Sequence, residues 1–246
     1  MTRKEKSISE KVRSHALFGG AITISLPASF SSASDIRQVP DNQEVFIDDA
    51  SDASLILELL DLERDKEGLE AATYFFNDLA EHNDAQNATI QYKEDLSGTS
   101  LVPNLAAYPT YALVGTQTVS KFHAADAALL PVRIYLVNVR LQQTGTDVLL
   151  TLNLPALAQA PAAASFNAAM FVKGNVCPDS GMAALQEALA SLTIRNWGLF
   201  GGAIRIRESV QHEYTHITAR QDGVGWAFSI RLLKVSNNAL IKSREA

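Results

Sequence analysis

A zinc-protease spacing occurs near the C-terminal end of the sequence, where His212, Glu213 and His216 fit the pattern H-E-x-x-H. That pattern binds zinc when a helix brings both histidines onto one face and sets the glutamate beside the bound water. The neighbouring Ile217 and Thr218 favour a strand instead. In a strand, positions 212 and 216 lie about 13 Å apart and cannot share a metal ion. We therefore expect no metal site, and a zinc hydrolase built on His212 and His216 is a remote alternative.

Other catalytic signatures are missing from the sequence. It has no G-x-S-x-G nucleophile motif, no phosphate-binding glycine loop and no dinucleotide fingerprint. The single cysteine, Cys177, precedes Pro178 and has no histidine close by in the sequence, so we expect an ordinary thiol and not a nucleophile. The sequence therefore predicts no catalytic residue, no cofactor and no covalent catalysis.

Acidic residues are concentrated in one quarter of the chain. The whole sequence of 246 residues has a net charge of −6, but residues 35–95 alone hold 17 acidic residues against 4 basic ones. Such a segment either keeps the surface solvated or forms a docking face for a basic protein partner. The overall charge is unsuited to nucleic acid, and the sequence contains no run of 18 apolar residues, so we expect neither nucleic-acid nor membrane binding.

Apolar periodicity predicts strands that alternate with a few helices. The expected strands cover 22–26, 44–47, 88–92, 111–122, 132–141 and 147–154, and the last two form a hairpin in which Gly145 takes a positive φ. The expected helices cover 54–63, 66–82 and 182–192. This order predicts an antiparallel sheet with helices packed on it.

The predicted domain occupies the middle of the chain. Residues 1–15 are polar and basic, so we expect a disordered arm. Residues 16–201 form the domain, and 155–167 is an Ala- and Pro-rich surface loop within it. Residues 202–246 carry seven basic and four acidic residues and contain two short strand patterns, at 214–218 and 226–230. We expect an extension that is loose or forms a hairpin, and that is dispensable for the domain.

Several sequence blocks resemble the Ran guanine nucleotide release factor family, the small eukaryotic nuclear-import factors of PsbP-like fold. The most specific block is Asp35–Phe46, DIRQVPDNQEVF, followed by Ser54–Asp61, SLILELLD. The others are Leu17–Ile22 with its Leu26-Pro27 strand end, Thr146–Pro155, and the segments Ser191–Thr193 and Leu199–Gly201. The resemblance covers about 17–201, and it departs from the family pattern in the long 155–181 loop, the basic arm and the 202–246 extension.

The resemblance implies an α/β/α sandwich around a mainly antiparallel sheet. It also implies that the chain binds the GTPase Ran, promotes nucleotide release from it by protein contact, supports nuclear import and occurs in the nucleus and cytoplasm. The acidic positions of the family that bind Ran match Glu58 and Asp61. The wider Ran-contacting stretch adds Asp35, Arg37, Asp41 and Glu44.

The residues themselves give a compatible interpretation of Glu58 and Asp61. In the expected 54–63 helix the two carboxylates are i,i+3 neighbours opposite an apolar face, which makes an acidic stripe on the surface. We expect this stripe to dock a basic surface of a monomeric protein. Two alternatives stay open: an adaptor that binds a GTPase without changing nucleotide exchange, and a photosynthetic PsbP-like subunit, which the acidic residues of the arm disfavour.

Overall fold

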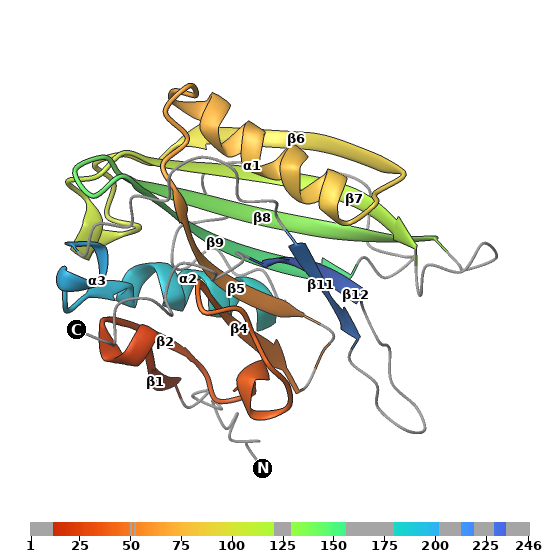
Figure 1. Ribbon diagram of the computed structural model, residues 1–246, viewed down its shortest axis with the longest axis horizontal. Coiled ribbons are helices and arrows are strands. Elements are labelled where there is room, and N and C mark those ends of the chain that lie inside the picture. The colour runs from red at the N-terminus through yellow and green to blue at the C-terminus, as the bar shows by residue number, and fades with distance from the viewer. Residues whose placement is uncertain are drawn as a thin grey trace, which may run out of the picture.

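A seven-stranded antiparallel sheet organises the chain in the computed structural model (Figure 1), which describes residues 12–49, 51, 53–120, 129–155, 180–201, 213–218 and 229–234. Its strand order is β3-β4-β5-β9-β8-β7-β6. The bounds are β3 Phe30–Ser32, β4 Gln43–Asp48, β5 Ser54–Asp61, β6 Asn87–Asp95, β7 Thr110–Ser120, β8 Leu129–Leu141 and β9 Thr146–Pro155. Every neighbouring pair in this sheet is antiparallel.

Helices and a small second sheet cover the large sheet. The helices are α1 Leu69–His82, α2 Ser180–Ser191 and α3 Gly198–Gly201, and the 3₁₀ turns are η1 Phe18–Gly20, η2 Ala33–Asp35 and η3 Pro103–Leu105. The small sheet has the order β1-β2-β10, with β1 Val12–Leu17, β2 Ile22–Pro27 and β10 Thr193–Ile194. It packs against the large sheet where the His15 ring meets Phe46 edge to face, with ring centroids 4.8 Å apart.

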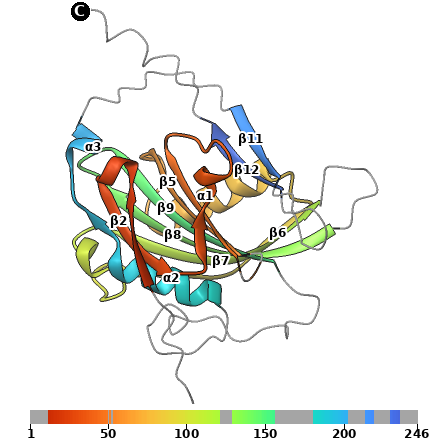
Figure 2. The ribbon, with the colours of Figure 1, turned by 90° about the horizontal axis from the view of Figure 1, so that it is seen from below.

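Two hydrophobic cores lie on opposite faces of the large sheet. On one face, Phe75 and Phe76 of α1 pack against Ile134 and Leu136 of β8. On the other face, α2 and β2 pack against Tyr135 and the following odd-numbered residues of β8. Side chains of a strand alternate between faces, so β8 is buried on both. Figures 1 and 2 show α1 on one side of the sheet and α2 on the other, which confirms the expected α/β/α sandwich.

Most of the expected elements are present. The strands predicted at 22–26, 44–47, 88–92 and 111–122 correspond to β2, β4, β6 and β7, although residues 121 and 122 lie outside the described residues. The hairpin of β8 and β9 has the expected register, and Gly145 has φ +67°. The helices predicted at 66–82 and 182–192 correspond to α1 and α2.

The helix predicted at 54–63 is wrong, because residues 54–61 form strand β5. This strand lies inside the sheet between β4 and β9, and it is buried on both faces. Leu55 and Leu57 enter the core beneath α2, whereas Ile56 enters a separate cluster with Val45. A strand buried on both faces needs a continuous apolar run, and a run of that kind does not differ from a buried helix by periodicity.

The N-terminal end of the chain differs in part from the expectation, whereas the C-terminal extension contains a strand pair of the kind that its hairpin alternative expects. Residues 12–15, expected in a disordered arm, belong to β1, which pairs with β2 from Val12 opposite Pro27 to Leu17 opposite Ile22. In the extension, β11 Glu213–Thr218 pairs with β12 Ser229–Lys234 as a two-stranded antiparallel sheet of their own.

The structure describes only part of the zinc-protease pattern, and several other segments discussed above lie outside the described residues. His216 lies in strand β11, as expected, while His212, Cys177, residues 1–11 and nearly all of the 155–167 loop lie outside the described residues. No helix in the described part of the chain is long and apolar enough to cross a membrane.

Candidate functional site: an acidic surface beside α1

Glu58 projects from β5 on the face of the sheet that α1 covers. Side chains of a strand alternate, and Leu60, two residues further on, packs with the α1 core. Glu58 pairs with Gln43 across β4 and β5, and the Gln43 side-chain amide donates to Glu58 Oε1. Burial raises the pKa of Glu58 to about 7, and the charge of Asp78 on α1 also raises it, against the opposing effect of the Gln43 hydrogen bond. Glu58 is therefore a half-buried carboxyl that titrates near neutral pH.

Helix α1 adds an exposed tyrosine among carboxylates. Tyr74 on this helix is exposed. Burial of part of its ring raises the pKa of the Tyr74 phenol, followed by the charges of Asp78 and Glu63, a hydrogen bond with Glu63 and the charge of Glu81. These residues and Glu58 form what we call the acidic α1 surface: Glu58, Glu63, Tyr74, Asp78 and Glu81.

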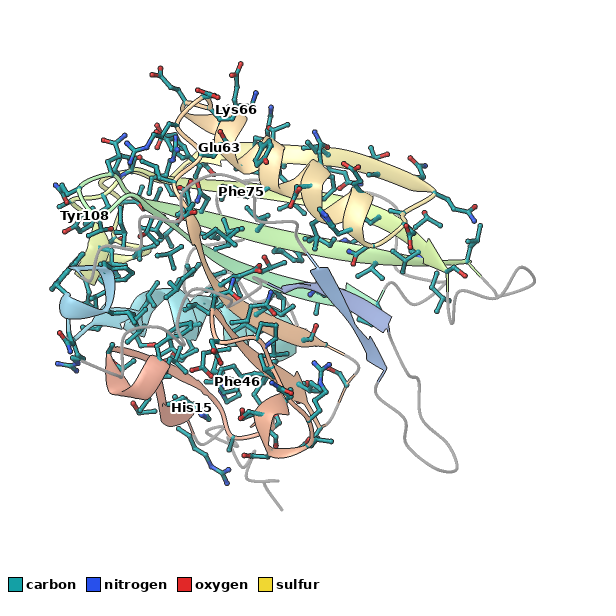
Figure 3. All side chains as sticks on the ribbon, viewed as in Figure 1. His15, Phe46, Glu63, Lys66, Phe75 and Tyr108 are labelled. Carbon is teal, nitrogen blue, oxygen red and sulfur yellow. The ribbon has the colours of Figure 1, made fainter. Side chains whose placement is uncertain are left out.

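A buried ion pair fixes the segment that carries Glu63. Arg140 Nε lies 2.9 Å from Asp147 Oδ1, and Asn138 donates to the same oxygen at 3.0 Å. The Arg140 guanidinium also donates to the backbone carbonyls of Glu63 and Lys66, at 2.5 Å each. The backbone N–H of Glu63 donates to Asp147 Oδ2 at 2.9 Å. The segment between β5 and α1 therefore has a defined course, and Figure 3 shows Glu63 and Lys66 beside the N-terminal end of α1.

The segment between β3 and β4 covers the same face of the sheet on the other side of Glu58. Its residues Ala33 and Val39 pack against Val45 and Ile56. At its end, the Asn42 carbonyl accepts from the backbone N–H of Leu59 at 2.9 Å, next to Glu58. Helix α1 and the 33–42 segment therefore cover neighbouring parts of one sheet face, and Glu58 lies on β5 between them.

The other expected partner-binding residues occupy different positions around this point. Asp35 and Asp41 are exposed on the 33–42 segment, and Arg37 is half-buried there with its pKa lowered by burial. Asp61 is exposed at the end of β5, three residues from Glu58, so the two carboxylates belong to opposite faces of the strand. The i,i+3 acidic stripe expected for Glu58 and Asp61 is thus replaced by two separate positions.

Glu44 has a bond within the domain. In β4 it alternates with Val45, so its side chain belongs to the opposite face of the sheet from Glu58. Glu44 Oε1 accepts a hydrogen bond from the backbone N–H of Phe18 at 2.7 Å, which fixes the η1 turn between β1 and β2. The structure therefore does not place Glu44 with the acidic α1 surface.

Sequence reasoning missed the part of this surface that α1 supplies. The helical spacing of Tyr74, Asp78 and Glu81 indicates that they share one face of α1. Because 54–63 was predicted as a helix, the sequence did not indicate that this face lies close to Glu58. A half-buried carboxyl beside an exposed tyrosine and further carboxylates suits recognition of a basic protein surface. Among the described residues, no group of three histidine, cysteine or acidic side chains is placed to hold a metal ion.

Comparisons with known proteins agree on one family. The sequence model of the family described as "Ran-interacting Mog1 protein" matches residues 15–155. The Ran guanine nucleotide release factor of Bos taurus is 32% identical over 192 residues, covering 78% of this chain and 98% of that protein. The nuclear import protein MOG1 of Saccharomyces cerevisiae is 31% identical over 156 residues, covering 56% of this chain and 64% of that protein. The crystal structure of the Saccharomyces cerevisiae Ran-binding protein Mog1p matches with a TM-score of 0.55 at 25% identity, covering 78% of this chain and 100% of that one.

Proposed function

Because this chain belongs to the Ran-interacting Mog1 protein family, we propose that it binds Ran through the acidic α1 surface and promotes guanine nucleotide release from Ran in support of nuclear protein import. Relatives are named a Ran guanine nucleotide release factor and a nuclear import protein, and a similar solved structure is described as a Ran-binding protein. The proposal includes presence in both nucleus and cytoplasm.

The observation that carries the proposal is the position of Glu58. It lies on a rigid inner strand, between α1 and the 33–42 segment, and α1 sets Asp78 close enough for its charge to raise the pKa of Glu58. Holding carboxylates this close to one another costs stability, because like charges repel. A basic group of a partner removes that repulsion on binding, so the arrangement favours a basic ligand surface.

Binding of this kind acts on nucleotide release through protein contact. A partner that binds the nucleotide-free form of a GTPase more tightly than the loaded form lowers nucleotide affinity by the same factor, since the two binding equilibria are linked. No covalent step is needed, and the side chains of the acidic α1 surface serve as contacts. Asp61, Asp35, Arg37 and Asp41 are proposed as further contacts around Glu58, and Glu44 as a residue that holds the η1 turn.

Calorimetric titration of Ran with the full-length chain tests the binding step. We expect saturable one-to-one binding by a monomer, and Glu58→Lys should weaken it by about 2–5 kcal/mol if the carboxylate is buried against a basic group of Ran. Glu187→Lys on α2 is the matched control, because it makes the same charge change on the opposite side of the sheet. No measurable Ran binding by the wild-type chain, or equal losses in the two variants, would overturn the proposal.

A further inference from the structure

The most exposed large apolar side chain in the described part of the protein is Ile36. It is 78% exposed, compared with 49% for Val12, 45% for Leu129 and 40% for Trp197. Single exposed apolar residues are common on protein surfaces, so exposure alone assigns no role. What distinguishes Ile36 is where the fold holds it.

The backbone around Ile36 is fixed by several hydrogen bonds. The carbonyl of Ala33 accepts from the backbone N–H groups of Ile36 and Arg37, both at 3.1 Å. The Ser32 hydroxyl accepts from the N–H of Ser34 at the start of the same 3₁₀ turn. Ala33 itself is buried against the sheet. Ile36 is therefore held out into solvent by an ordered turn, and fixing it on a partner costs little additional entropy.

The turn belongs to the same side of the molecule as Glu58. Ala33 and Val39 pack on Val45 and Ile56, which share the sheet face of Glu58. The exposed carboxylate of Asp35 precedes Ile36 directly. The tip of the turn thus combines one large apolar side chain with a negative charge, on a segment that covers the same sheet face as Glu58.

We propose that Ile36 is an apolar anchor of the interface with Ran, inserting into an apolar pocket of Ran that is bordered by basic groups. This inference rests on the proposed function and names a determinant of the same interface. Interfaces gain most of their affinity from a few well-placed side chains surrounded by a polar rim, and Ile36 beside the exposed carboxylate of Asp35, on a segment that covers the sheet face of Glu58, fits that arrangement. Ile36 acts on the lifetime of the complex, whereas exposed carboxylates at the rim, such as Asp35, act on the rate of encounter.

Association and dissociation rates of Ran, measured with full-length Ile36→Ser at low and high salt, test the proposal. We expect the complex of Ran with the Ile36→Ser variant to dissociate at least about tenfold faster than the wild-type complex at both salt concentrations, with little change in the association rate. The Ile36→Leu variant should keep most of the wild-type affinity. The matched control is Leu129→Ser, which removes an exposed leucine at the far end of β8 and should leave both rates unchanged.

The outcomes separate the two proposals. Wild-type rates for Ile36→Ser, with normal Ran binding by the wild-type chain, overturn the role of Ile36 and leave the proposed function intact. Equal losses in Ile36→Ser and Leu129→Ser also overturn that role, because they indicate nonspecific apolar adhesion. Absence of Ran binding by the wild-type chain overturns the proposed function and this inference together. The melting temperature of Ile36→Ser should equal that of the wild type, since the side chain is mostly exposed.

Discussion

Gln43 and Glu58 lie opposite each other on β4 and β5, and the Gln43 amide donates a hydrogen bond to the Glu58 carboxylate. Glu58 belongs to the acidic segment 35–95 and lies on an inner strand of the large sheet. The hydrogen bond favours the charged form of Glu58, but burial outweighs it and the pKa still rises to about 7. Glu58 therefore changes its charge within the physiological range of pH.

The free energy of unfolding should report this titration. The folded domain keeps a proton on Glu58 up to about pH 7, whereas a glutamate in the unfolded chain releases it near pH 4.5. Between these values the folded state binds more protons, so this residue lowers stability as pH rises through the interval. Glu58→Gln removes the effect. Urea denaturation at both pH values measures the free energy of unfolding of the variant and of the wild type. The difference, variant minus wild type, should be more positive at pH 8 than at pH 5 by on the order of 2 kcal/mol.

The control for that experiment is Glu70→Gln, which neutralises an exposed carboxylate in the first turn of α1. It reports any change in stability that follows from losing a surface charge of α1 alone. A pH-independent difference for Glu58→Gln would show that Glu58 ionises at its ordinary pKa in the folded domain.

Loss of the buried Arg140–Asp147 pair should destabilise the domain strongly. Asp147→Ala leaves the Arg140 guanidinium buried without its carboxylate and removes the acceptor for Glu63 N–H. We expect a loss of about 3–5 kcal/mol, measured by chemical denaturation. Asp65→Ala, at an exposed position of the segment that this pair holds, should change stability by less than about 0.5 kcal/mol. Similar values for the two variants would mean that the pair contributes little.

The contact between α1 and β7 should not tolerate a methyl group at Gly115. A Cβ there would lie 2.3 Å from two ring carbons of Phe76 and 3.1 Å from the Thr89 carbonyl oxygen. Gly115→Ala should therefore cost about 1–3 kcal/mol in thermal or chemical unfolding. In a Phe76→Leu background the same substitution should cost less, because the smaller side chain leaves room for the methyl group. Strict additivity of the two substitutions would contradict this contact as the cause.

The sequence predicts the fold best where the apolar periodicity of two segments and the residues of the turn between them indicate the same structure. The β8–β9 hairpin is the clearest example, because two long apolar runs flank a turn whose Gly145 has the positive φ expected of it. The prediction failed at β5, where Leu55, Ile56 and Leu57 enter cores on both faces of the sheet. No local period distinguishes such a strand from a helix, since burial on both faces is set by the neighbouring strands β4 and β9.

The sequence was enough to name residues of the candidate site, but it did not show how those residues are arranged in space. Glu58 and Asp61 come from resemblance to the family, and the acidic block is visible in the composition. Their geometry required the strand assignment, which separates the two carboxylates onto opposite faces and brings Asp78 of α1 toward Glu58. Tyr74 was missed because helical spacing alone could not decide which side of α1 faces the sheet.

Truncation after Gly201 should leave the domain and its binding to Ran intact. The seven-stranded sheet and its two coverings are complete before that residue, and β11 pairs with β12 rather than with the large sheet. We expect an unchanged melting temperature and an unchanged affinity for Ran. A large fall in melting temperature would show that the extension is part of the fold. A gain in affinity that disappears at high salt would show that its basic residues compete with Ran for the acidic α1 surface.

The rate at which a fluorescent guanine nucleotide leaves purified Ran tests the central claim most directly. We predict that the wild-type chain raises this rate in a concentration-dependent manner. Glu58→Lys should shift the response to higher concentrations, while Glu187→Lys should behave as wild type. If Ran binds the wild-type chain but releases its nucleotide no faster, the chain is an adaptor and the proposed release activity is contradicted.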